Sequence, residues 1–455
     1  MTDIIASVSG VRGILGDNLT PENIIKFTSA FIEYCRKNSK SKNIVIGYDG
    51  RKHGNIISDL VLSTVSMCGY TATDIGVVPT PTVQIATEDL KAAGGIAITA
   101  SHNPQIWNGL KFLNSNGTFL DGEQIKKVIE SYKKSIFDYA GINDIKPIES
   151  DYTWIQKHID KVLKLKSVKA GKIKKRKFKI VVDAVNSSGS YIVPVLLQKL
   201  GCKVIELFCD GSGIFPHMPE PLPYNLKQLC TAVKKHKADF GISVDPDTDR
   251  LVIITDKGEP YIEENTITTV VKSVMRNSKL KNKTATVNLS TTRAVDDVAK
   301  EFGGKVFRSA VGEINVVKEM KRNKSIVGGE GSGGVIIPEL HYGRDAIVGI
   351  ALILQEFAGF KGKISEYKET LPKYYISKAK FDVKGNPDSL LKKVIAYYKN
   401  QDCRITTADG VKLDFADYWI HMRKSNTEPI IRIIVEARGK KEAEDIQNKL
   451  KSFLK

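Results

Sequence analysis

The stretch 99–111 places a hydroxyl, an imidazole and an ammonium group close together along the chain. Ser101 and His102 directly follow an apolar run, 95–98, which predicts a short buried strand, and a proline then breaks the chain. Ser101 is a candidate nucleophile, His102 a candidate proton carrier and Lys111 a cation on the same loop. Taken alone, these residues favour an ordinary turn in which the serine caps backbone groups. The chemistry therefore depends on what the rest of the chain supplies.

Three aspartates, Asp245, Asp247 and Asp249, alternate directly after the stretch 239–244, whose largely apolar residues predict a buried strand. Their carboxylates would repel one another severely without a cation between them. Oxygen-only ligands select a hard ion, and they favour Mg²⁺ where a phosphate completes the shell. An EF-hand is rejected, because the positions that need Gly and Glu hold Arg and Asp. The D-x-D-x-[T/V] loop of aspartyl-phosphate phosphatases fits badly, because its fifth position is Asp249.

A glycine-rich stretch at 329–334 matches the pattern G-x-G-x-x-G. A dinucleotide-binding loop needs a helix directly after it, but the following residues, 335–338, form a strand-like run that ends at a proline. The stretch instead suits hydrogen bonding to a polyol such as a sugar, with Glu330 and Ser332 as the binding residues. A plain hairpin turn is the alternative.

A fourth stretch, 423–429, gathers a guanidinium, two hydroxyls and an amide within a few residues. Such a loop can bind an anion through its backbone N–H groups and a bidentate arginine. A helix-capping turn is the alternative, but no convincing helix follows it. The candidate anion-binding residues are Arg423, Ser425, Asn426, Thr427 and Arg432.

Composition indicates a protein with large buried cores and anionic partners. The chain has 455 residues, a length that corresponds to about three or four domains. Hydrophobic residues make up 42% of it, and its net charge is +18. A positively charged protein attracts anionic partners, which include phosphorylated small molecules, nucleic acid and membrane surfaces. The densest basic run, 164–177, has no interleaved aromatic residues for stacking bases, so it is interpreted as a solvated interdomain connection.

The remaining sequence features indicate a cytoplasmic protein. The six cysteines form no C-x-x-C pair, which argues against zinc and disulfides and suits a reducing cytosol. The longest apolar run, 346–354, is too short to cross a bilayer, and the first residues lack the pattern of a signal peptide. No membrane or nucleic-acid partner is therefore expected.

A unit of strand, helix, glycine and strand recurs along the chain, at 43–75, 179–207 and 284–307. Strands that alternate with helices predict mostly parallel sheets covered on both faces, so the pattern suggests three related α/β domains. From residue 373 onward strands outnumber helices, which predicts a small α+β domain that ends in an amphipathic helix from Lys441.

Together these stretches resemble the α-D-phosphohexomutases. The family's phosphoserine loop, T-A-S-H-N-P-x-x-x-N-G-x-K, is matched by residues 99–111, and its metal loop, D-x-D-x-D-R, by residues 245–250. Its sugar loop, G-E-x-S-G, is matched at 329–333, its phosphate loop, R-x-S-[G/N]-T-E-P, at 423–429, and its early S-G-[I/V]-R-G at 9–13. The motifs follow the family's order across essentially the whole chain. The resemblance implies four domains around a central cleft, three α/β domains at 1–150, 151–255 and 256–368 and a smaller α+β domain at 369–455.

The resemblance also implies roles for the candidate residues. Ser101 would carry a phosphoryl group, donate it to a hexose phosphate and recover the other phosphoryl group from an enzyme-bound sugar 1,6-bisphosphate. Asp245, Asp247 and Asp249 would hold Mg²⁺ together with a phosphoserine oxygen. The other implied roles are stabilisation of the transferring group by Arg12 and Arg250, proton transfer by Lys111 or His102, sugar binding by Glu330 and Ser332, and binding of the non-reacting phosphate by Arg423, Ser425, Asn426 and Thr427.

Substrate choice depends on departures from the common pattern. Residues 311–313 resemble the V-G-[D/E] loop of phosphoglucosamine mutases, whereas Asn426 is more usual in phosphomannomutase/phosphoglucomutases. Gly334 replaces the His that commonly ends G-E-x-S-G-H, and residues 343–346 depart from the usual T-G-D-G-like stretch. We expect a phosphoglucosamine mutase, with a phosphomannomutase/phosphoglucomutase as the first alternative. A metal-dependent sugar phosphatase and a non-enzymatic polyanion-binding protein are more distant alternatives, and a monomer or homodimer is expected.

Overall fold

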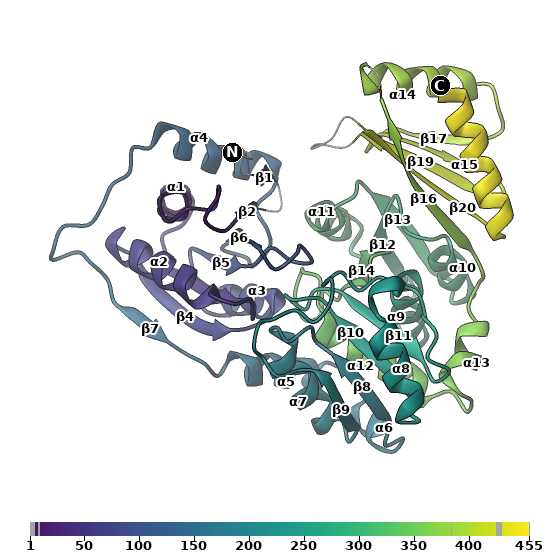
Figure 1. Cartoon of the computed structure of the whole chain (residues 1–455), viewed down its shortest axis with the longest axis horizontal. Helices are drawn as coiled ribbons and strands as arrows, with labels where there is room; N and C mark the ends of the chain where they lie inside the picture. The colour runs from purple at the N-terminus through teal and green to yellow at the C-terminus, as the bar shows by residue number, and fades with distance from the viewer. Residues whose placement is uncertain (1–4, 8–9, 384, 425–429, 455) are drawn as a thin grey trace. The chain divides into compact units, whose positions relative to one another are not determined.

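The computed structural model describes residues 5–7, 10–383, 385–424 and 430–454. These residues form two compact units. Figure 1 labels their helices and strands. The first unit contains the chain up to residue 266 together with residues 332–368, and the second contains residues 267–331 and 369–455.

The first unit begins with a seven-stranded mixed sheet in the order β1-β2-β6-β5-β3-β4-β7. Strands β5, β3, β4 and β7 run parallel, whereas β1, β2 and β6 join the sheet through antiparallel pairs. Its strands are β1 (Ile5–Ser7), β2 (Gly10–Ile14), β3 (Asn43–Tyr48), β4 (Thr71–Val77), β5 (Gly94–Ile98), β6 (Trp107–Asn114) and β7 (Ile148–Ser150).

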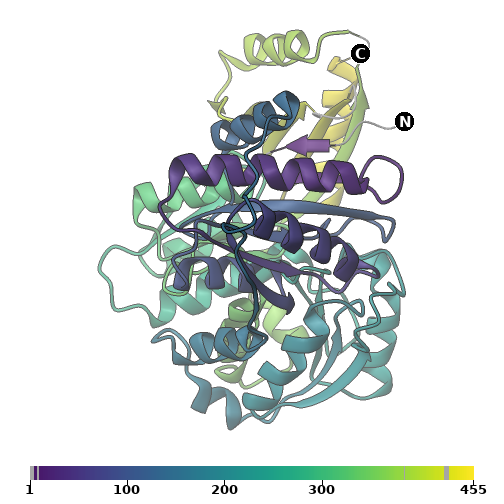
Figure 2. The ribbon, with the colours of Figure 1, turned by 90° about the vertical axis from the view of Figure 1, so that its left-hand side faces the viewer.

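Helices cover both faces of this sheet, because its central strands are continuous apolar runs whose successive side chains point to opposite faces. Ile44 and Ile46 of β3 contribute to a core with α1 (Pro21–Asn38), α2 (Gly54–Met67) and α4 (Gly122–Lys134). Figure 2 shows the long α1 helix in dark purple. Val45 points to the opposite core, which includes residues of α3 (Thr80–Asp89) and Trp154, the first residue of α5 (Trp154–Lys164).

A second sheet of the first unit has the strand order β11-β10-β8-β9, in which β8 runs parallel to both neighbours. Helix α8 covers one face through Leu229 and Val233, and α12 packs on the other, where the rings of Phe357 and Phe240 lie 5.4 Å apart. The strands are β8 (Lys179–Asp183), β9 (Lys203–Phe208), β10 (Phe240–Val244) and β11 (Leu251–Thr255). Further elements are α7 (Gly189–Lys199), a 3₁₀ turn (Pro223–Asn225), α8 (Lys227–Lys235), β15 (Gly334–Ile336), α12 (Ala346–Ala358) and α13 (Ile364–Glu369).

The interpretation of the basic run 164–177 as a solvated connection is only partly right. Its lysines are exposed, but it also contains α6 (Ala170–Lys174), which packs against α12. Ile173 is fully buried, and the backbone N–H of Lys169 donates to Gln355. Apolar residues spaced between the lysines therefore attach this segment to the fold.

The second unit contains parallel strands and a separate antiparallel sheet. Strand β12 pairs in parallel with β13 and β14, and the antiparallel sheet has the order β16-β20-β19-β18-β17. The first group comprises α9 (Glu263–Asn277), β12 (Thr284–Asn288), α10 (Ala294–Glu301), β13 (Lys305–Ser309), α11 (Glu313–Asn323) and β14 (Val327–Glu330). The second comprises β16 (Tyr375–Asp382), α14 (Pro387–Tyr398), β17 (Arg404–Thr406), β18 (Val411–Asp414), β19 (Trp419–Lys424), β20 (Ile430–Ala437) and α15 (Lys440–Leu454).

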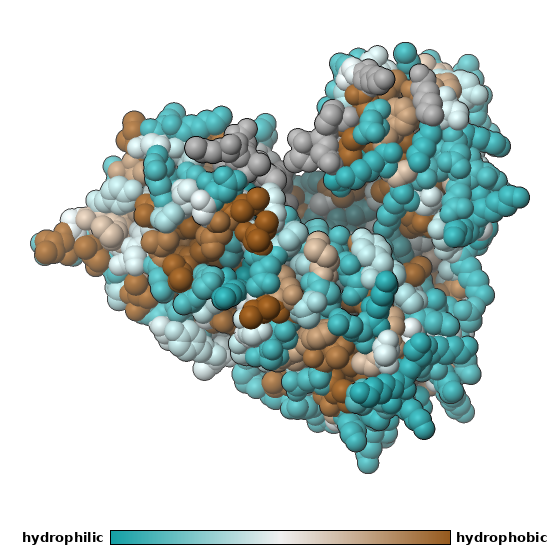
Figure 3. All heavy atoms as spheres, viewed as in Figure 1, coloured by the Kyte–Doolittle hydropathy of each residue, from teal (hydrophilic) through white to brown (hydrophobic). Residues whose placement is uncertain are grey.

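The architecture confirms the predicted fold class of three α/β domains with mostly parallel sheets and a smaller C-terminal α+β domain. Within the described part of the chain, no helix combines the length and apolar character that crossing a membrane requires. The face drawn in Figure 3 is largely hydrophilic. The connection between α4 and β7 nevertheless carries exposed isoleucines, among them Ile136 and Ile142.

Candidate active site

Ser101 lies on the loop that follows β5, and its side chain is buried. Its backbone has a φ of +53°, in the left-handed region that non-glycine residues seldom adopt. Its N–H donates to the Thr99 hydroxyl at 2.8 Å. Ser101 Oγ lies 3.3 Å from His102 Nδ1 and donates to Asp245 Oδ2, also at 3.3 Å. The serine is therefore held in an unusual backbone conformation beside the acidic loop.

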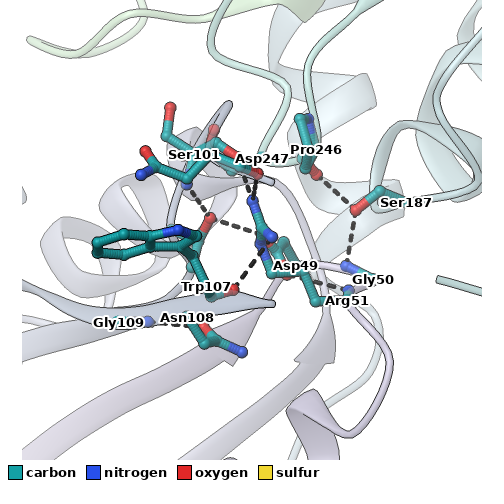
Figure 4. A network of polar contacts seen from close by, with 12 residues as sticks. Asp49, Gly50, Arg51, Ser101, Trp107, Asn108, Gly109, Ser187, Pro246 and Asp247 are labelled. Atoms are coloured by element: carbon teal, nitrogen blue, oxygen red, sulfur yellow. Dashed lines mark hydrogen bonds and ion pairs between the residues drawn. The ribbon is translucent and has the colours of Figure 1, made fainter. Parts of the chain in front are cut away.

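A buried arginine that the sequence analysis missed holds this loop in place. The guanidinium of Arg51 donates to the carbonyl of Ser101 at 2.6 Å, and to three further carbonyls of the loop. Figure 4 shows Arg51 at the centre of these contacts. Asp49 accepts from Arg51 Nε at 3.1 Å. Burial raises the pKa of Asp49, and the Arg51 charge and the Thr99 hydroxyl act against that rise.

The acidic loop follows β10, and its three carboxylates are almost completely buried. One oxygen from each of Asp245, Asp247 and Asp249 can be chosen so that all lie within 4.8 Å of one another. The backbone N–H groups of Asp249 and Arg250 donate to Asp245 Oδ1 at 3.1 and 3.0 Å. Thr248, with a φ of +58°, lets the loop curl, so the alternate carboxylates converge as the sequence predicted.

Two of these carboxylates have strongly shifted acidity. Burial raises the pKa of Asp245 well above its usual value, and the negative charges of Asp249 and Asp247 raise it further. Burial alone would also raise the pKa of Asp247, but the ammonium of Lys111 and a hydrogen bond from Thr80 hold it below its usual range. Lys111 Nζ lies 2.6 Å from Asp247 Oδ2, and Thr80 Oγ1 donates to the same oxygen at 2.7 Å.

The donor set fits a hard divalent cation. Asp247 Oδ1 and Asp249 Oδ1 are buried and find no hydrogen-bond donor among the residues that the structure describes. Buried carboxylate oxygens are normally satisfied, and three buried carboxylates within 4.8 Å strongly favour a positive ion between them. Oxygen ligands alone are the set that Mg²⁺ prefers.

Two arginines, one on a neighbouring strand and one on the acidic loop, add positive charge to this site. Arg12, on β2, donates to Asn103 Oδ1 at 3.3 Å, and Arg250 donates to Glu220 Oε1 at 3.1 Å. Burial lowers the pKa of Arg12. Burial also lowers the pKa of His102 to about 2, with the positive charges of Arg250 and Arg12 adding to the effect. The imidazole is therefore neutral at physiological pH.

Both arginines keep an unused donor. The Nε atoms of Arg12 and Arg250 are buried and lack an acceptor in the described part of the chain. Guanidinium groups with unused N–H donors are suited to the oxygens of a phosphate. The site around Ser101 therefore offers buried donors to an anion and buried acceptors to a cation.

The glycine-rich stretch contributes to both units. Glu330, in the second unit, is buried and accepts from Asn288 Nδ2 at 2.8 Å and from the backbone N–H of Gly312 at 3.0 Å. Ser332 belongs to the first unit, where the following Gly333 accepts from the N–H of Leu251 at 3.0 Å. The strand-like run after the glycines is confirmed as β15, which agrees with the rejection of a dinucleotide-binding loop.

The predicted phosphate loop lies partly outside the described residues. Arg423 Nε lies 2.7 Å from Asp409 Oδ2, and the backbone N–H of Val311 donates to the same carboxylate oxygen at 2.9 Å. Arg432, on the neighbouring strand β20, is the cross-strand partner of Arg423, and its side chain is exposed. Ser425, Asn426 and Thr427 lie outside the described residues.

The first unit thus brings together Ser101, His102, Lys111, Arg12, Arg250 and the three aspartates, while Glu330, Arg423 and Arg432 belong to the second unit. Sequence reasoning missed Asp49, Arg51, Thr80 and Glu220. A local signal for Arg51 was present, because Gly50 and Arg51 directly follow the first strand of the recurring unit predicted at 43–75. Strands β3 and β5 run parallel, so their carboxyl ends meet at the same sheet edge.

The chain matches four family models in succession. These models describe the phosphoglucomutase/phosphomannomutase α/β/α domains I, II and III and the C-terminal domain of the same family. They match residues 4–138, 156–258, 263–375 and 379–452, respectively.

Two named relatives and a solved structure agree with these matches. The chain is 37% identical to a phosphoglucomutase/phosphomannomutase of Thermococcus kodakarensis, over 96% of this chain and 95% of that protein. It is 32% identical to a phosphoglucosamine/phosphogalactosamine mutase of Sulfurisphaera tokodaii, over 98% of each chain. A phosphoglucomutase/phosphomannomutase family protein of Burkholderia thailandensis superposes with a TM-score of 0.85 at 25% identity, over 98% of this chain and 97% of that one. The chain therefore belongs to the phosphoglucomutase/phosphomannomutase family of α-D-phosphohexomutases, which are isomerases.

Proposed function

We propose that the chain interconverts a hexose 6-phosphate and the corresponding hexose 1-phosphate, with Ser101 as the phosphoryl carrier. The observation that carries this proposal is that buried hydrogen-bond donors and buried carboxylate oxygens, both without partners in the part of the chain that the structure describes, lie around the buried hydroxyl of Ser101. Two arginine Nε donors and two aspartate oxygens lack partners among the described residues of this site. A phosphoryl group and a divalent cation together would satisfy both sets.

The proposed cycle conserves the phosphoryl groups. The O–P bond of phosphorylated Ser101 breaks as the free hydroxyl of the hexose phosphate forms a new O–P bond, which gives the 1,6-bisphosphate. The hydroxyl proton leaves to a base, and Ser101 Oγ regains a proton. After the bisphosphate turns over in the site, Ser101 Oγ attacks the other phosphoryl group and recovers it. His102 and Lys111 remain the two candidates for the proton, since both lie in this site.

Residues around Ser101 would hold the transferring phosphoryl group in place and neutralise its negative charge. Arg12 and Arg250 would bind its oxygens through their unused Nε donors. Arg51 fixes the loop that presents Ser101, and Lys111 holds Asp247 in its ionised form. Asp245, Asp247 and Asp249, with an oxygen of the phosphoserine, would hold Mg²⁺. When bound, this ion supplies charge neutralisation at the phosphoryl oxygens.

The proposal assigns the sugar hydroxyls to Glu330 and Ser332, and the non-reacting phosphate to Arg423, Arg432 and the residues 425–427. These assignments rest on the motifs at 329–333 and 423–429. A separate site for the distal phosphate suits the reaction, because the intermediate must present either phosphate to Ser101.

We propose glucosamine phosphate as the preferred substrate. The V-G-E loop at 311–313 supports this choice, and its Gly312 donates to the proposed sugar-binding residue Glu330. The relatives carry both kinds of name, since the Thermococcus protein is called a phosphoglucomutase/phosphomannomutase and the Sulfurisphaera protein a phosphoglucosamine/phosphogalactosamine mutase. A phosphomannomutase/phosphoglucomutase is therefore the direct alternative. The cytoplasmic location and the monomeric or dimeric state stay predictions from sequence.

Coupled assays with the 6-phosphates of glucosamine, glucose and mannose test the proposal. We expect each active substrate to give its 1-phosphate, with the highest kcat/KM for glucosamine 6-phosphate. If glucosamine 6-phosphate is the poorest of the three, the substrate assignment is wrong. Release of inorganic phosphate without any isomerised sugar would instead identify a phosphatase.

A further inference from the structure

We infer that Arg344 is a positioning residue for the metal-binding carboxylate of Asp249, and that Gly334 is a glycine because the Arg344 side chain passes over it. These are the two places where the chain departs from the pattern of the family it resembles. The inference rests on the proposed metal site and deepens it, because it adds a residue outside the four motifs.

The first observation is an ion pair at the acidic loop. Arg344 Nη2 lies 2.6 Å from Asp249 Oδ2, and the Arg344 side chain is 12% exposed while that of Asp249 is 1% exposed. The other oxygen, Asp249 Oδ1, is buried and without a hydrogen bond within the described ranges. The guanidinium thus anchors one carboxylate oxygen and leaves the other available to an ion.

The other two aspartates also have an oxygen that the chain anchors. Asp247 Oδ2 is held by Lys111 and Thr80, while its Oδ1 has no partner in the part of the chain that is described. Asp245 Oδ1 is held by the backbone N–H groups of Asp249 and Arg250. Each carboxylate therefore has one oxygen fixed by a donor of the chain. Such supporting contacts orient metal ligands, and their loss commonly weakens ion binding.

The second observation is the path of the Arg344 side chain. A Cβ atom built on Gly334 would lie 2.3 Å from Arg344 Cδ and 3.1 Å from Arg344 Cγ. These are atoms in the middle of the side chain, so the arginine could not keep its course beside a larger residue. Gly334 has no positive φ, and backbone strain therefore does not require a glycine there. The space for Arg344 is the reason that the structure offers.

The backbone that carries Arg344 is firmly held. The neighbouring Asp345 accepts from the N–H of Ile347 at 2.7 Å at the start of α12, and its other oxygen lies 2.8 Å from His158 Nε2. The N–H of Ala346 donates to the carbonyl of Thr248, within the acidic loop, at 3.2 Å. Arg344 therefore extends from a fixed point beside the loop that it supports.

A double-mutant cycle read by ion binding tests the inference. The dissociation constant of Mn²⁺, used as a probe for Mg²⁺, is measured by electron paramagnetic resonance for the wild type, Arg344→Ala, Gly334→Ala and the double variant. We expect each single variant to weaken Mn²⁺ binding about 10- to 100-fold. The double variant should bind no more weakly than Arg344→Ala, because Gly334→Ala acts only by displacing the arginine.

Matched variants control for general effects. Gly171→Ala adds a methyl group where nothing lies within 4 Å, and Arg176→Ala removes an exposed arginine of the same unit, so both should leave the Mn²⁺ affinity unchanged. Arg344→Gln keeps most of the side chain without the charge and should bind Mn²⁺ more weakly than the wild type. It also replaces Arg344→Ala in the cycle if circular dichroism shows that the alanine variant does not fold.

The outcomes separate this inference from the proposed function. If Arg344→Ala binds Mn²⁺ within twofold of the wild type, or more tightly, Arg344 does not position Asp249. If the losses of the two single variants add in the double variant, Gly334 and Arg344 are not coupled. Either result overturns the inference while mutase activity of the wild type still supports the proposed function. A wild-type protein that binds no Mn²⁺ overturns the inference and the metal site together.

Discussion

The guanidinium of Arg51 donates a 2.6 Å hydrogen bond to the carbonyl of Ser101. The same group binds three other carbonyls of the loop and the carboxylate of Asp49, so one buried side chain determines where the candidate nucleophile lies. The left-handed backbone of Ser101 is a cost that these contacts offset.

Arg51→Lys should lower kcat while the protein stays folded. A lysine keeps the charge beside Asp49, but its single ammonium cannot bind four carbonyls in the planar arrangement of a guanidinium. A displacement of the loop by about 1 Å would cost about 100-fold in rate. The measurement is kcat in a coupled mutase assay together with the melting temperature. Arg36→Lys is the control, because Arg36 also donates to backbone carbonyls, those of Cys68 and Asp138, in the same domain. Equal rates for the two variants would contradict the role of Arg51.

Lys111→Met should be far more damaging than Thr80→Val, although both residues bind Asp247 Oδ2. Burial favours protonation of Asp247, and the Lys111 charge is the main force that opposes it. The lysine variant leaves a buried carboxylate without its cation, and we expect a loss of at least about 100-fold in kcat. The threonine variant loses one hydrogen bond of about 1 kcal/mol, which corresponds to a roughly fivefold effect. Similar kcat values for the two variants would show that the ammonium is dispensable.

Divalent ions should stabilise the wild-type protein, and chelation should abolish its activity. An ion at 100 times its dissociation constant adds about 2.7 kcal/mol to the free energy of unfolding. The melting temperature should therefore rise as Mg²⁺ is added to chelator-treated protein. Asp249→Asn should reduce this rise, whereas Asp239→Asn, just before β10, should keep it. Melting temperatures that do not respond to Mg²⁺ would contradict a metal site at the three aspartates.

Lys412 predicts a pH dependence of stability that is independent of the active site. Its Nζ donates to the Leu289 carbonyl at 2.9 Å and lies 4.5 Å from the centre of the Trp419 ring. Burial, together with the positive charge of Arg308, lowers its pKa from 10.5 to about 7. Between these two values the unfolded chain binds more protons than the folded one, so the stability contributed at this site increases as the pH rises above 7.

The melting temperatures of the wild type and Lys412→Met, measured between pH 7 and 9, test this effect. As the pH rises, the melting temperature of the wild type should increase relative to that of the variant. The corresponding difference in the free energy of unfolding grows by at most about 1.4 kcal/mol per pH unit. Lys440→Met, which removes an exposed lysine, should follow the wild type at every pH. Parallel curves for the wild type and Lys412→Met would show that the buried lysine titrates normally.

Sequence reasoning found the features that are local along the chain. The strand before Ser101, the strand before Asp245 and the strand that follows the glycine-rich stretch all follow from apolar periodicity and from glycine and proline positions. The same reasoning places a serine and three carboxylates at strand ends, where parallel sheets collect functional residues.

Other contacts could not be predicted, because they join residues that are distant in sequence. The position of Arg51 after a strand was visible in the sequence, but its partners are carbonyl groups, which leave no side-chain pattern. Thr80 reaches Asp247 across 167 positions. The departures at Gly334 and at 343–346 were visible in the sequence, but their connection required the position of the Arg344 side chain. The basic run at 164–177 was misjudged for a similar reason, since the packing of its helix α6 against α12 joins residues that are distant in sequence.

The central claim is that Ser101 carries the phosphoryl group, and peptide mapping tests it most directly. The protein is incubated with glucose 1,6-bisphosphate and Mg²⁺, its intact mass is measured, and the modified peptide is sequenced by mass spectrometry. We predict one added phosphoryl group on Ser101, none on Ser101→Ala, and loss of nearly all mutase activity in that variant. Mutase activity that persists undiminished in Ser101→Ala, or a phosphoryl group found on a different residue, would contradict the account.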